Sequence, residues 1–270
     1  DVQVRLAVAF ARIQSNDLTG AYAVPQEGLA GPNPNNPDLL ALQSETLFAL
    51  GLPKPALEQI ERALGAQPGT PHPYQVFQRG RYRMALRDYD GAIADFESVV
   101  GARDPRFDER VEYAVYTELA SAQYASMIAK QATPADASAI AVEALRRGAA
   151  RFTELKNQAD KDQTREHYSR AAGTLQGMAC GFIVLGEDYG AAVTALTDLL
   201  GKTNDPGVRY LIHYNLGHAQ LLKGDIAAVV IIPHLLCVFA GLLLLMRAGM
   251  GALAKEADYP GWAKLGLLLW

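Results

Sequence analysis

The chain has 270 residues, of which 50% are hydrophobic, and its 25 basic and 29 acidic residues give a formal net charge of −4. This length supports one extended or two compact domains with a sizeable core. The mildly acidic balance, without a run of lysines or arginines interleaved with aromatics, argues against a nucleic-acid partner.

The two cysteines leave the redox compartment undetermined. Cys180 and Cys237 lie in different kinds of sequence, the second inside an apolar run, so they are poor partners for one disulfide. The chain begins at Asp1 without a methionine or an apolar leader. This start is compatible with a processed or partial protein and with a signal peptide already removed.

Residues 1–36 are expected to hold a short helical hairpin and a linker. The segment RLAVAFARIQ has a helical apolar rhythm, SND interrupts it, and a second short helix follows. The stretch PQEGLAGPNPNNPD is rich in Pro, Gly and Asn and predicts an irregular loop. We interpret this region as a degenerate first copy of the unit that follows.

A spacing of small and bulky residues recurs three times, within 52–64, 89–100 and 189–200. In each copy an alanine is followed four residues later by a bulky side chain, and three residues further on by an apolar or small one. The three sets are Ala56, Ile60 and Ala63; Ala92, Phe96 and Val99; and Ala192, Leu196 and Leu199. Self-similarity at a fixed spacing indicates a repeat architecture.

Small residues and prolines bracket each copy. Another small residue stands twelve positions before each alanine, and a proline follows the last apolar position. The small residues are Ser44, Gly80 and Cys180, and the prolines are Pro68, Pro105 and Pro206. This pattern resembles the tetratricopeptide repeat (TPR), a pair of antiparallel helices of about 34 residues in which small residues permit close helix packing.

The resemblance covers 37–70, 73–106 and 173–206, and a fourth unit that begins near Tyr210. It implies an all-α fold with a TPR-like helical-hairpin solenoid over residues 37–225. The expected fold class adds a transmembrane helix after the solenoid, which rests on hydropathy and length and not on the resemblance. An ordinary helical bundle with core-facing alanines is the alternative.

Residues 108–172 fit the repeat less well. They contain two helical segments that are longer than a repeat helix and are joined at the dipeptide AT, with Pro134 and Asp136 as a helix start signal. These features predict an elongated helical hairpin inside the array.

The residue types that carry enzyme chemistry form no recognisable motif. The five histidines make no HExxH helix, none pairs with a CxxC, and His213 and His218 are five residues apart, off a common helical face. No GxSxG, GxxxxGK[ST] or GxGxxG motif is present. We therefore expect no catalytic residue, no metal and no cofactor, and predict a protein that is not an enzyme.

A TPR-like solenoid implies a concave surface lined by the first helix of each repeat and suited to a peptide or a neighbouring protein. The resemblance places the lining positions at the second, fifth, ninth and twelfth residues of each unit. They are Asp38, Ala41, Glu45 and Phe48; Tyr74, Phe77, Arg81 and Met84; and Leu211, Tyr214, His218 and Leu221. Aromatic, arginine and methionine side chains suit a partly apolar protein segment. Alternatively several of them, particularly Phe77 and Tyr214, pack between repeats.

The repeat character ends after Asp225. From Ile226 to Met246, 21 consecutive residues carry no formal charge. At about 1.5 Å per residue this run spans roughly 30 Å, the hydrocarbon thickness of a bilayer. The sequence predicts a transmembrane helix over 226–252, which either completes the last hairpin or follows a break near residues 229–232.

Residues 253–270 are expected at the membrane interface. Basic and aromatic side chains anchor at headgroup level, and the predicted interface residues are Arg247, Tyr259, Trp262 and Lys264. The final segment LGLLLW is too short to span a membrane and predicts an interfacial end or the start of a second membrane segment. The basic residues of this loop favour a periplasmic or otherwise extracytoplasmic repeat domain, and the opposite orientation stays open.

Together these features predict a non-catalytic, membrane-anchored adaptor or scaffold that holds a protein partner at the membrane surface within a multi-protein assembly. Protein partners are expected through the solenoid, and lipid and other membrane subunits through 226–270. One alternative is an integral structural subunit of an envelope complex for secretion, motility or energy transduction, without a free peptide ligand. Another is the soluble part of an enzyme or transporter whose active part lies beyond Trp270.

Overall fold

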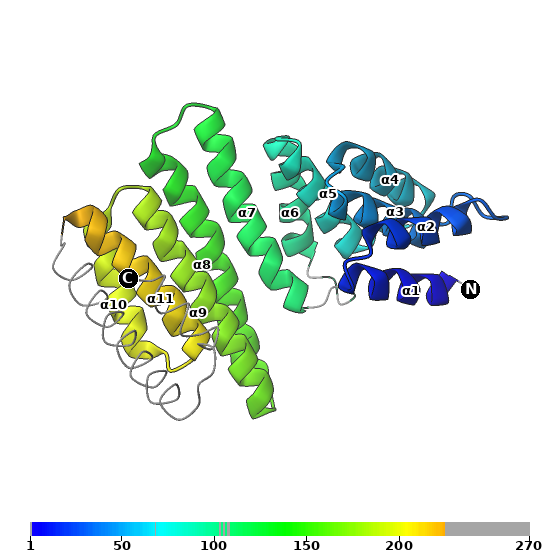
Figure 1. Ribbon diagram of the computed structural model, residues 1–270. Coiled ribbons are helices and arrows are strands. Elements are labelled where there is room, and N and C mark those ends of the chain that lie inside the picture. The colour runs from blue at the N-terminus through cyan, green and yellow to red at the C-terminus, as the bar shows by residue number, and fades with distance from the viewer. Residues whose placement is uncertain (1, 68, 103, 105, 107–108, 225–270) are drawn as a thin grey trace, which may run out of the picture. The chain divides into compact units, whose positions relative to one another are not determined.

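The computed structural model of the protein describes residues 2–67, 69–102, 104, 106 and 109–224. Within these ranges all regular secondary structure is α-helical, in eleven helices named α1 to α11 (Figure 1). The predicted all-α class is therefore confirmed for the described residues. Two compact units divide the chain: Asp1–Glu187, with α1 to α9, and a second unit from Asp188 onward, with α10 and α11.

The N-terminal hairpin consists of α1 (Val2–Gln14) and α2 (Leu18–Leu29). The Asp17 carboxylate accepts a hydrogen bond of 2.9 Å from the Gly20 backbone N–H and so caps α2. The loop expected from Pro25 onward is shorter than predicted, because α2 continues through this proline. Pro25 is buried in the hairpin, and its packing outweighs its poor helix propensity.

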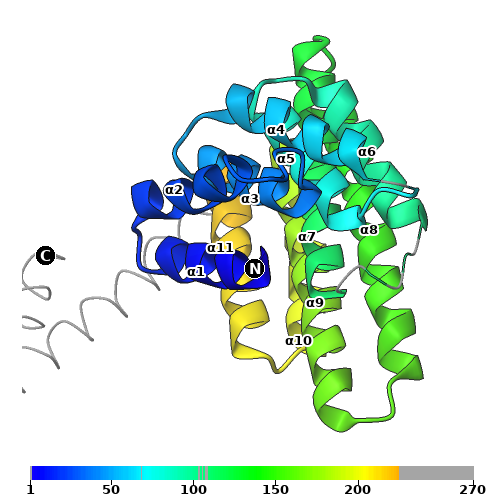
Figure 2. The ribbon, with the colours of Figure 1, turned by 90° about the vertical axis from the view of Figure 1, so that its right-hand side faces the viewer.

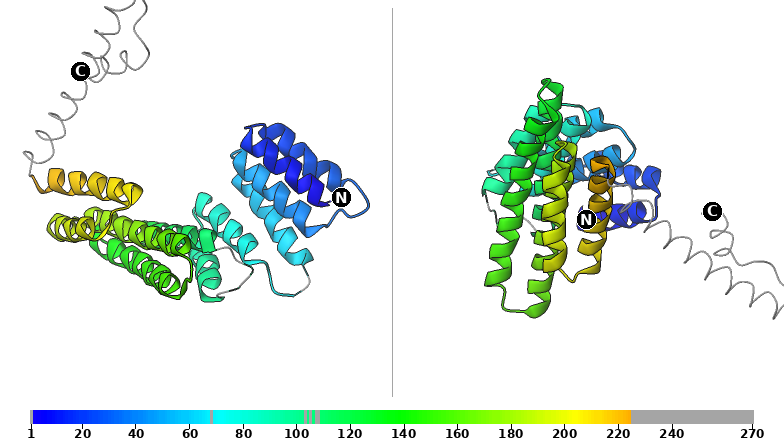
Figure 3. Two further views of the ribbon diagram at one scale, coloured as in Figure 1. Left: turned by 90° about the horizontal axis from the view of Figure 1, so that it is seen from below. Right: turned by 90° about the vertical axis from the view of Figure 1, so that its left-hand side faces the viewer.

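Two hairpins of nearly equal length follow: α3 (Pro37–Ala49) with α4 (Pro53–Ala66), and α5 (Pro73–Ala85) with α6 (Tyr89–Ala102). Three of these helices begin with proline. Proline is favoured at the first position because the backbone N–H that it lacks would have no partner within the helix. Consecutive helices pack on each other, and α1 also contacts α3; the left panel of Figure 3 shows the blue helices side by side. Both pairs are helical hairpins, as the resemblance to the TPR predicted.

Small residues let the two helices of a hairpin approach closely. Ala56 and Ala92 are fully buried. A Cβ atom placed on Gly80 of α5 would lie 2.5 Å from Cε1 of Phe96 on α6, so a larger residue fits only if this ring moves. Ser44 of α3, also fully buried, takes the matching position in the preceding hairpin.

An ion-pair network joins α5 to α6. Asp95 of α6 is buried, and its carboxylate accepts hydrogen bonds from Arg79 at 2.6 Å and from Arg83 at 2.9 Å. Arg83 also lies 3.6 Å from Glu61 of α4. A buried carboxylate needs such charged donors, so this pairing fixes how α5 and α6 meet.

The next three helices are longer: α7 (Glu109–Ala129), α8 (Pro134–Gln158) and α9 (Asp162–Leu185). Helix α8 packs against both neighbours (Figure 2), and α9 begins well before the unit expected from residue 173. Their interior is rich in alanine and contains the fully buried Phe152 and Leu145. The buried alanines are Ala120, Ala122, Ala137, Ala141, Ala144, Ala149, Ala172 and Ala179.

The second unit contains α10 (Tyr189–Lys202) and α11 (Pro206–Lys223), which pack against each other. Ala192 is fully buried. The Asp205 carboxylate caps α11, and Pro206 is the first residue of that helix, so α11 starts before Tyr210. Its Gly224 C-cap has a φ of 87°, a left-handed conformation that favours glycine.

No helix among the described residues is long and apolar enough to cross a membrane. The predicted transmembrane helix at 226–252 and the segment 253–270 lie outside the described residues, together with the expected interface residues Arg247, Tyr259, Trp262 and Lys264. The membrane assignments therefore stay predictions.

Candidate protein-binding groove

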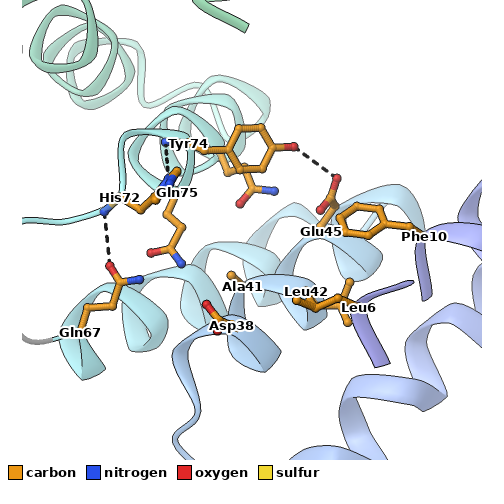
Figure 4. Close-up of a pocket in the computed structure, with 11 residues that line it drawn as sticks. Leu6, Phe10, Asp38, Ala41, Leu42, Glu45, Gln67, His72, Tyr74 and Gln75 are labelled. Carbon is orange, nitrogen blue, oxygen red and sulfur yellow. Dashed lines mark hydrogen bonds between the residues drawn. The ribbon is translucent and has the colours of Figure 1, made fainter. Parts of the chain in front are cut away.

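A groove of about 230 Å³ opens on the first helices of the first three hairpins, α1, α3 and α5 (Figure 4). Pockets that take whole small molecules measure roughly 300–1,000 Å³, so this groove suits one side chain or a short segment. The lining residues are Leu6 and Phe10 of α1; Asp38, Ala41, Leu42 and Glu45 of α3; Gln67 at the end of α4; and His72, Tyr74, Gln75 and Gln78 at and after the start of α5.

Polar side chains form the wall between α3 and α5. The Tyr74 hydroxyl donates a long hydrogen bond of 3.5 Å to Oε1 of Glu45, and Gln78 bonds the same carboxylate. Burial raises the pKa of Glu45 despite these donors and the nearby Arg81. Burial, and then the Glu45 charge, raise the pKa of Tyr74 to about 12. The groove thus holds a carboxylate that its neighbours compensate only in part.

Arg81 lies beside this wall, and its guanidinium contacts two aromatic rings and a carboxylate. Its guanidinium carbon is 5.2 Å from the centre of the Phe48 ring and 5.9 Å from that of Phe77. Its Nε is 3.8 Å from Oε1 of Glu118 on α7. These cation–π and ionic contacts join α5 to α3 and α7.

Gln75 lines the groove and carries a buried acceptor that has no partner in the described part of the chain. The residue is only 6% exposed, and its Oε1 has no hydrogen-bond partner among the described residues. Figure 4 shows the side chain reaching from α5 toward the side of the groove that carries Asp38 and Gln67. A buried acceptor without a donor is costly, so a ligand that supplies one would be favoured.

The ionisable lining side chains give the groove a negative character. Asp38 is an exposed carboxylate, and Glu45 is a half-buried one. Burial lowers the pKa of His72, and the Arg106 cation acts in the same direction, so the imidazole adds no positive charge at neutral pH.

Four of the predicted lining positions, Asp38, Ala41, Glu45 and Tyr74, do line the groove. The predicted set lacks the contribution of α1, because a degenerate first copy over residues 1–36 has no lining positions assigned by the resemblance. Its signal is the pair Leu6 and Phe10, four residues apart and therefore on one helical face. The other missed residues are Leu42, Gln67, His72, Gln75 and Gln78.

The remaining predicted positions on α3 and α5 lie next to the groove rather than in it. Phe48 stacks on Tyr82 with 4.7 Å between ring centres. Phe77 is 5% exposed, and its ring centre lies 5.8 Å from that of Phe96. It therefore packs in the core, in line with the alternative that Phe77 packs between repeats. Met84 is partly buried against the same core.

The predicted positions on α11 belong to the second unit. Tyr214 and His218 are exposed, and their ring centres are 4.6 Å apart. Leu211 is half-buried and Leu221 is exposed. Their role as a binding surface stays a prediction.

Metal sites require clustered ligating side chains, and reactive cysteines require an accessible thiolate. The described residues contain no group of three or more His, Cys, Asp or Glu side chains that could hold a metal ion. Burial raises the pKa of the Cys180 thiol, which keeps it in its unreactive protonated form.

Comparison with known proteins gives a distant likeness among solved structures. No family model matches the chain, and no curated protein matches it. Among solved structures, the crystal structure of MamA is similar, with a TM-score of 0.42 and 17% sequence identity, covering 82% of this chain and 97% of that one. At this score the likeness carries no argument, and the helical hairpins are described from the structure itself.

Proposed function

We propose that the protein is a non-catalytic TPR-like scaffold that binds a segment of a partner protein in the groove on α1, α3 and α5. The observation that carries this proposal is the groove: the first helices of three successive hairpins contribute apolar side chains and partly satisfied polar ones to one concavity. Such a surface suits a protein segment, which offers both apolar contact and directional hydrogen bonds.

We further propose that residues 226–252 anchor this scaffold in a membrane, as part of a multi-protein assembly, with the repeats on the extracytoplasmic side. The support is the uncharged run from Ile226 to Met246. Anchoring would raise the effective concentration of a partner that is bound to the same membrane.

The groove is tested with Ala41→Phe, which places an aromatic ring in a concavity of about 230 Å³. The full-length protein and this variant are purified from native membranes in mild detergent, and mass spectrometry identifies their companions. The wild type should retain a protein partner that Ala41→Phe loses, while thermal unfolding of the two proteins stays alike.

Other outcomes of this purification separate the rival functions. Several membrane chains that stay stoichiometric with both proteins would favour the structural subunit and contradict partner capture in the groove. Recovery of the full-length protein in the soluble fraction would contradict the anchor alone.

A further inference from the structure

We propose that the groove selects a basic side chain, a lysine or arginine presented by the partner segment. This inference rests on the proposed function and names what the groove recognises. Four observations support it: the negative charges that line the groove, the unpartnered Oε1 of Gln75, the apolar lining side chains, and the contacts that Arg81 makes with other residues.

The charged side chains that line the groove are both negative. Asp38 and Glu45 stand seven residues apart on α3, two helical turns and about 10 Å along its axis. No lysine or arginine is among the described lining residues. Because Glu45 is partly shielded from water, an incoming cation is attracted more strongly there than at the surface.

The unpartnered Oε1 of Gln75 points independently to a donor. Lysine and arginine bring three and five N–H donors and no acceptor. An acidic side chain would bring only acceptors, leave Gln75 unsatisfied and lie beside two like charges. A neutral apolar side chain would also leave Gln75 without a donor. A cationic side chain both supplies a donor to Gln75 and carries the charge opposite to that of Asp38 and Glu45.

The apolar part of the groove fits the stem of such a side chain. Leu6, Ala41 and Leu42 supply aliphatic surface, and Phe10 supplies an aromatic ring that is 43% exposed. Lysine and arginine bury their methylene stems on apolar surface while the charged head reaches polar groups. The Phe10 ring adds a cation–π contact to a head that passes over its face.

Arg81, the cation nearest the polar wall, does not satisfy these groups. It acts on Glu45 by its charge, yet the pKa of Glu45 stays raised. Its guanidinium contacts Phe48, Phe77 and Glu118 instead. The Glu45 carboxylate is therefore compensated only in part, and Oε1 of Gln75 has no donor among the described residues, so a cation from outside would meet both.

A random peptide display library, selected on the purified full-length protein, tests the inference. Peptides that bind wild type but not Ala41→Phe are groove-dependent and are synthesised for fluorescence anisotropy. We expect them to share a lysine or arginine whose replacement by norleucine or glutamate weakens binding by about tenfold or more. Glu45→Gln and Asp38→Asn should weaken binding in the same sense, whereas Glu58→Gln, an exposed carboxylate on α4 outside the groove, should not.

The outcomes separate the inference from the proposed function. Groove-dependent peptides that lack a basic residue, or that bind the Asp38→Asn, Glu45→Gln double variant as tightly as wild type, would overturn the selectivity and leave the scaffold function intact. If no selected peptide depends on the groove, both proposals fail. Carbodiimide coupling of a selected lysine peptide should join its amine to Asp38 or Glu45, and coupling found only elsewhere would also overturn the inference.

Discussion

The short hairpins α3 to α6 and the long helices α7 to α9 of the first unit are all α-helical, but different kinds of side chain are buried between them. In α7 to α9 the interior is mostly alanine, leucine and aromatic side chains. In α3 to α6 it includes six of the nine buried polar side chains of the described residues. These six are Gln43, Ser44, Thr46, Gln75, Gln78 and Asp95. Ser44, Thr46 and Asp95 are hydrogen-bonded within the hairpins, whereas Gln75 and Gln78 line the groove. Buried polar groups are costly unless paired, and Oε1 of Gln75 has no partner among the described residues, so the short hairpins bear this cost at the groove while the long helices provide a packed support.

The strongest test of this contrast is Phe152→Ala in α8. Phe152 is fully buried and lies 6.3 Å from the Tyr113 ring and 6.1 Å from the Tyr168 ring. Its truncation should lower the free energy of unfolding by about 3–5 kcal/mol, measured by urea denaturation. Peptide binding by the folded protein should be unchanged. A folded variant that has lost binding would break the division between support and groove.

Asp95→Asn tests the buried ion pairs of the short hairpins. The amide loses the charged hydrogen bonds from Arg79 and Arg83. Both arginines are partly exposed, so they can recover hydration. The free energy of unfolding should fall by about 2–3 kcal/mol, less than for a fully buried pair. Arg62→Gln, which alters an exposed arginine of α4 hydrogen-bonded to Gln59, is the control and should leave urea denaturation within about 0.5 kcal/mol of wild type.

Two glycine substitutions compare close packing with open space. A Cβ on Gly148 of α8 would lie 2.6 Å from Cγ of Tyr116, so Gly148→Ala should destabilise by about 1–2 kcal/mol. A Cβ on Gly65 of α4 meets nothing within 4 Å, so Gly65→Ala should stabilise by about 0.5–1 kcal/mol through helix propensity. Thermal unfolding should show a lower melting temperature for Gly148→Ala and a higher one for Gly65→Ala. Equal shifts for the two variants would contradict the close packing of the long helices.

The smallest effect concerns Glu45 in the absence of a partner. Because burial raises its pKa in the folded protein, its contribution to stability is complete below the unfolded pKa and is lost as the pH rises through the folded pKa. At neutral pH the ionised carboxylate opposes folding. Glu45→Gln should therefore be slightly more stable than wild type at neutral pH, although it binds peptide less well.

Urea denaturation across the acidic and neutral range checks this prediction. The difference in unfolding free energy between Glu45→Gln and wild type should grow as the pH rises. Glu58→Gln serves as the matched control and should show no such trend. If Glu45→Gln instead becomes less stable than wild type as the pH rises to neutral, the ionised carboxylate stabilises the packing of the hairpins, and the prediction is wrong.

The sequence predicts the contacts within a hairpin, where the spacing of small and bulky residues repeats. It does not predict the contacts between helices that are not consecutive in the chain. The spacing of Gly80, Ala92 and Phe96 predicted a close hairpin contact, and the structure has it. On α5, Tyr74 and Phe77 are three residues apart, yet one lines the groove and the other lies in the core. Their difference depends on how α3 and α7 approach α5, which no local pattern encodes.

The groove was predictable only in part for the same reason. Lining positions on α3 and α5 follow from helical periodicity. The contribution of Phe10 and the missing partner of Gln75 depend on the approach of α1 to α3 and on the space left between α3 and α5. The continuation of α2 through Pro25 is a further case in which tertiary burial overrides a local signal.

Hydrogen exchange of the full-length protein with and without a groove-dependent peptide tests the central claim most directly. Mass spectrometry resolves which helices the peptide protects. Binding in the groove predicts slower amide exchange in α3 and α5, some slowing in α1, and no change in α8. Protection confined to α8 and α9, or to α11, with the peptide fully bound would contradict the assignment of the groove as the binding site.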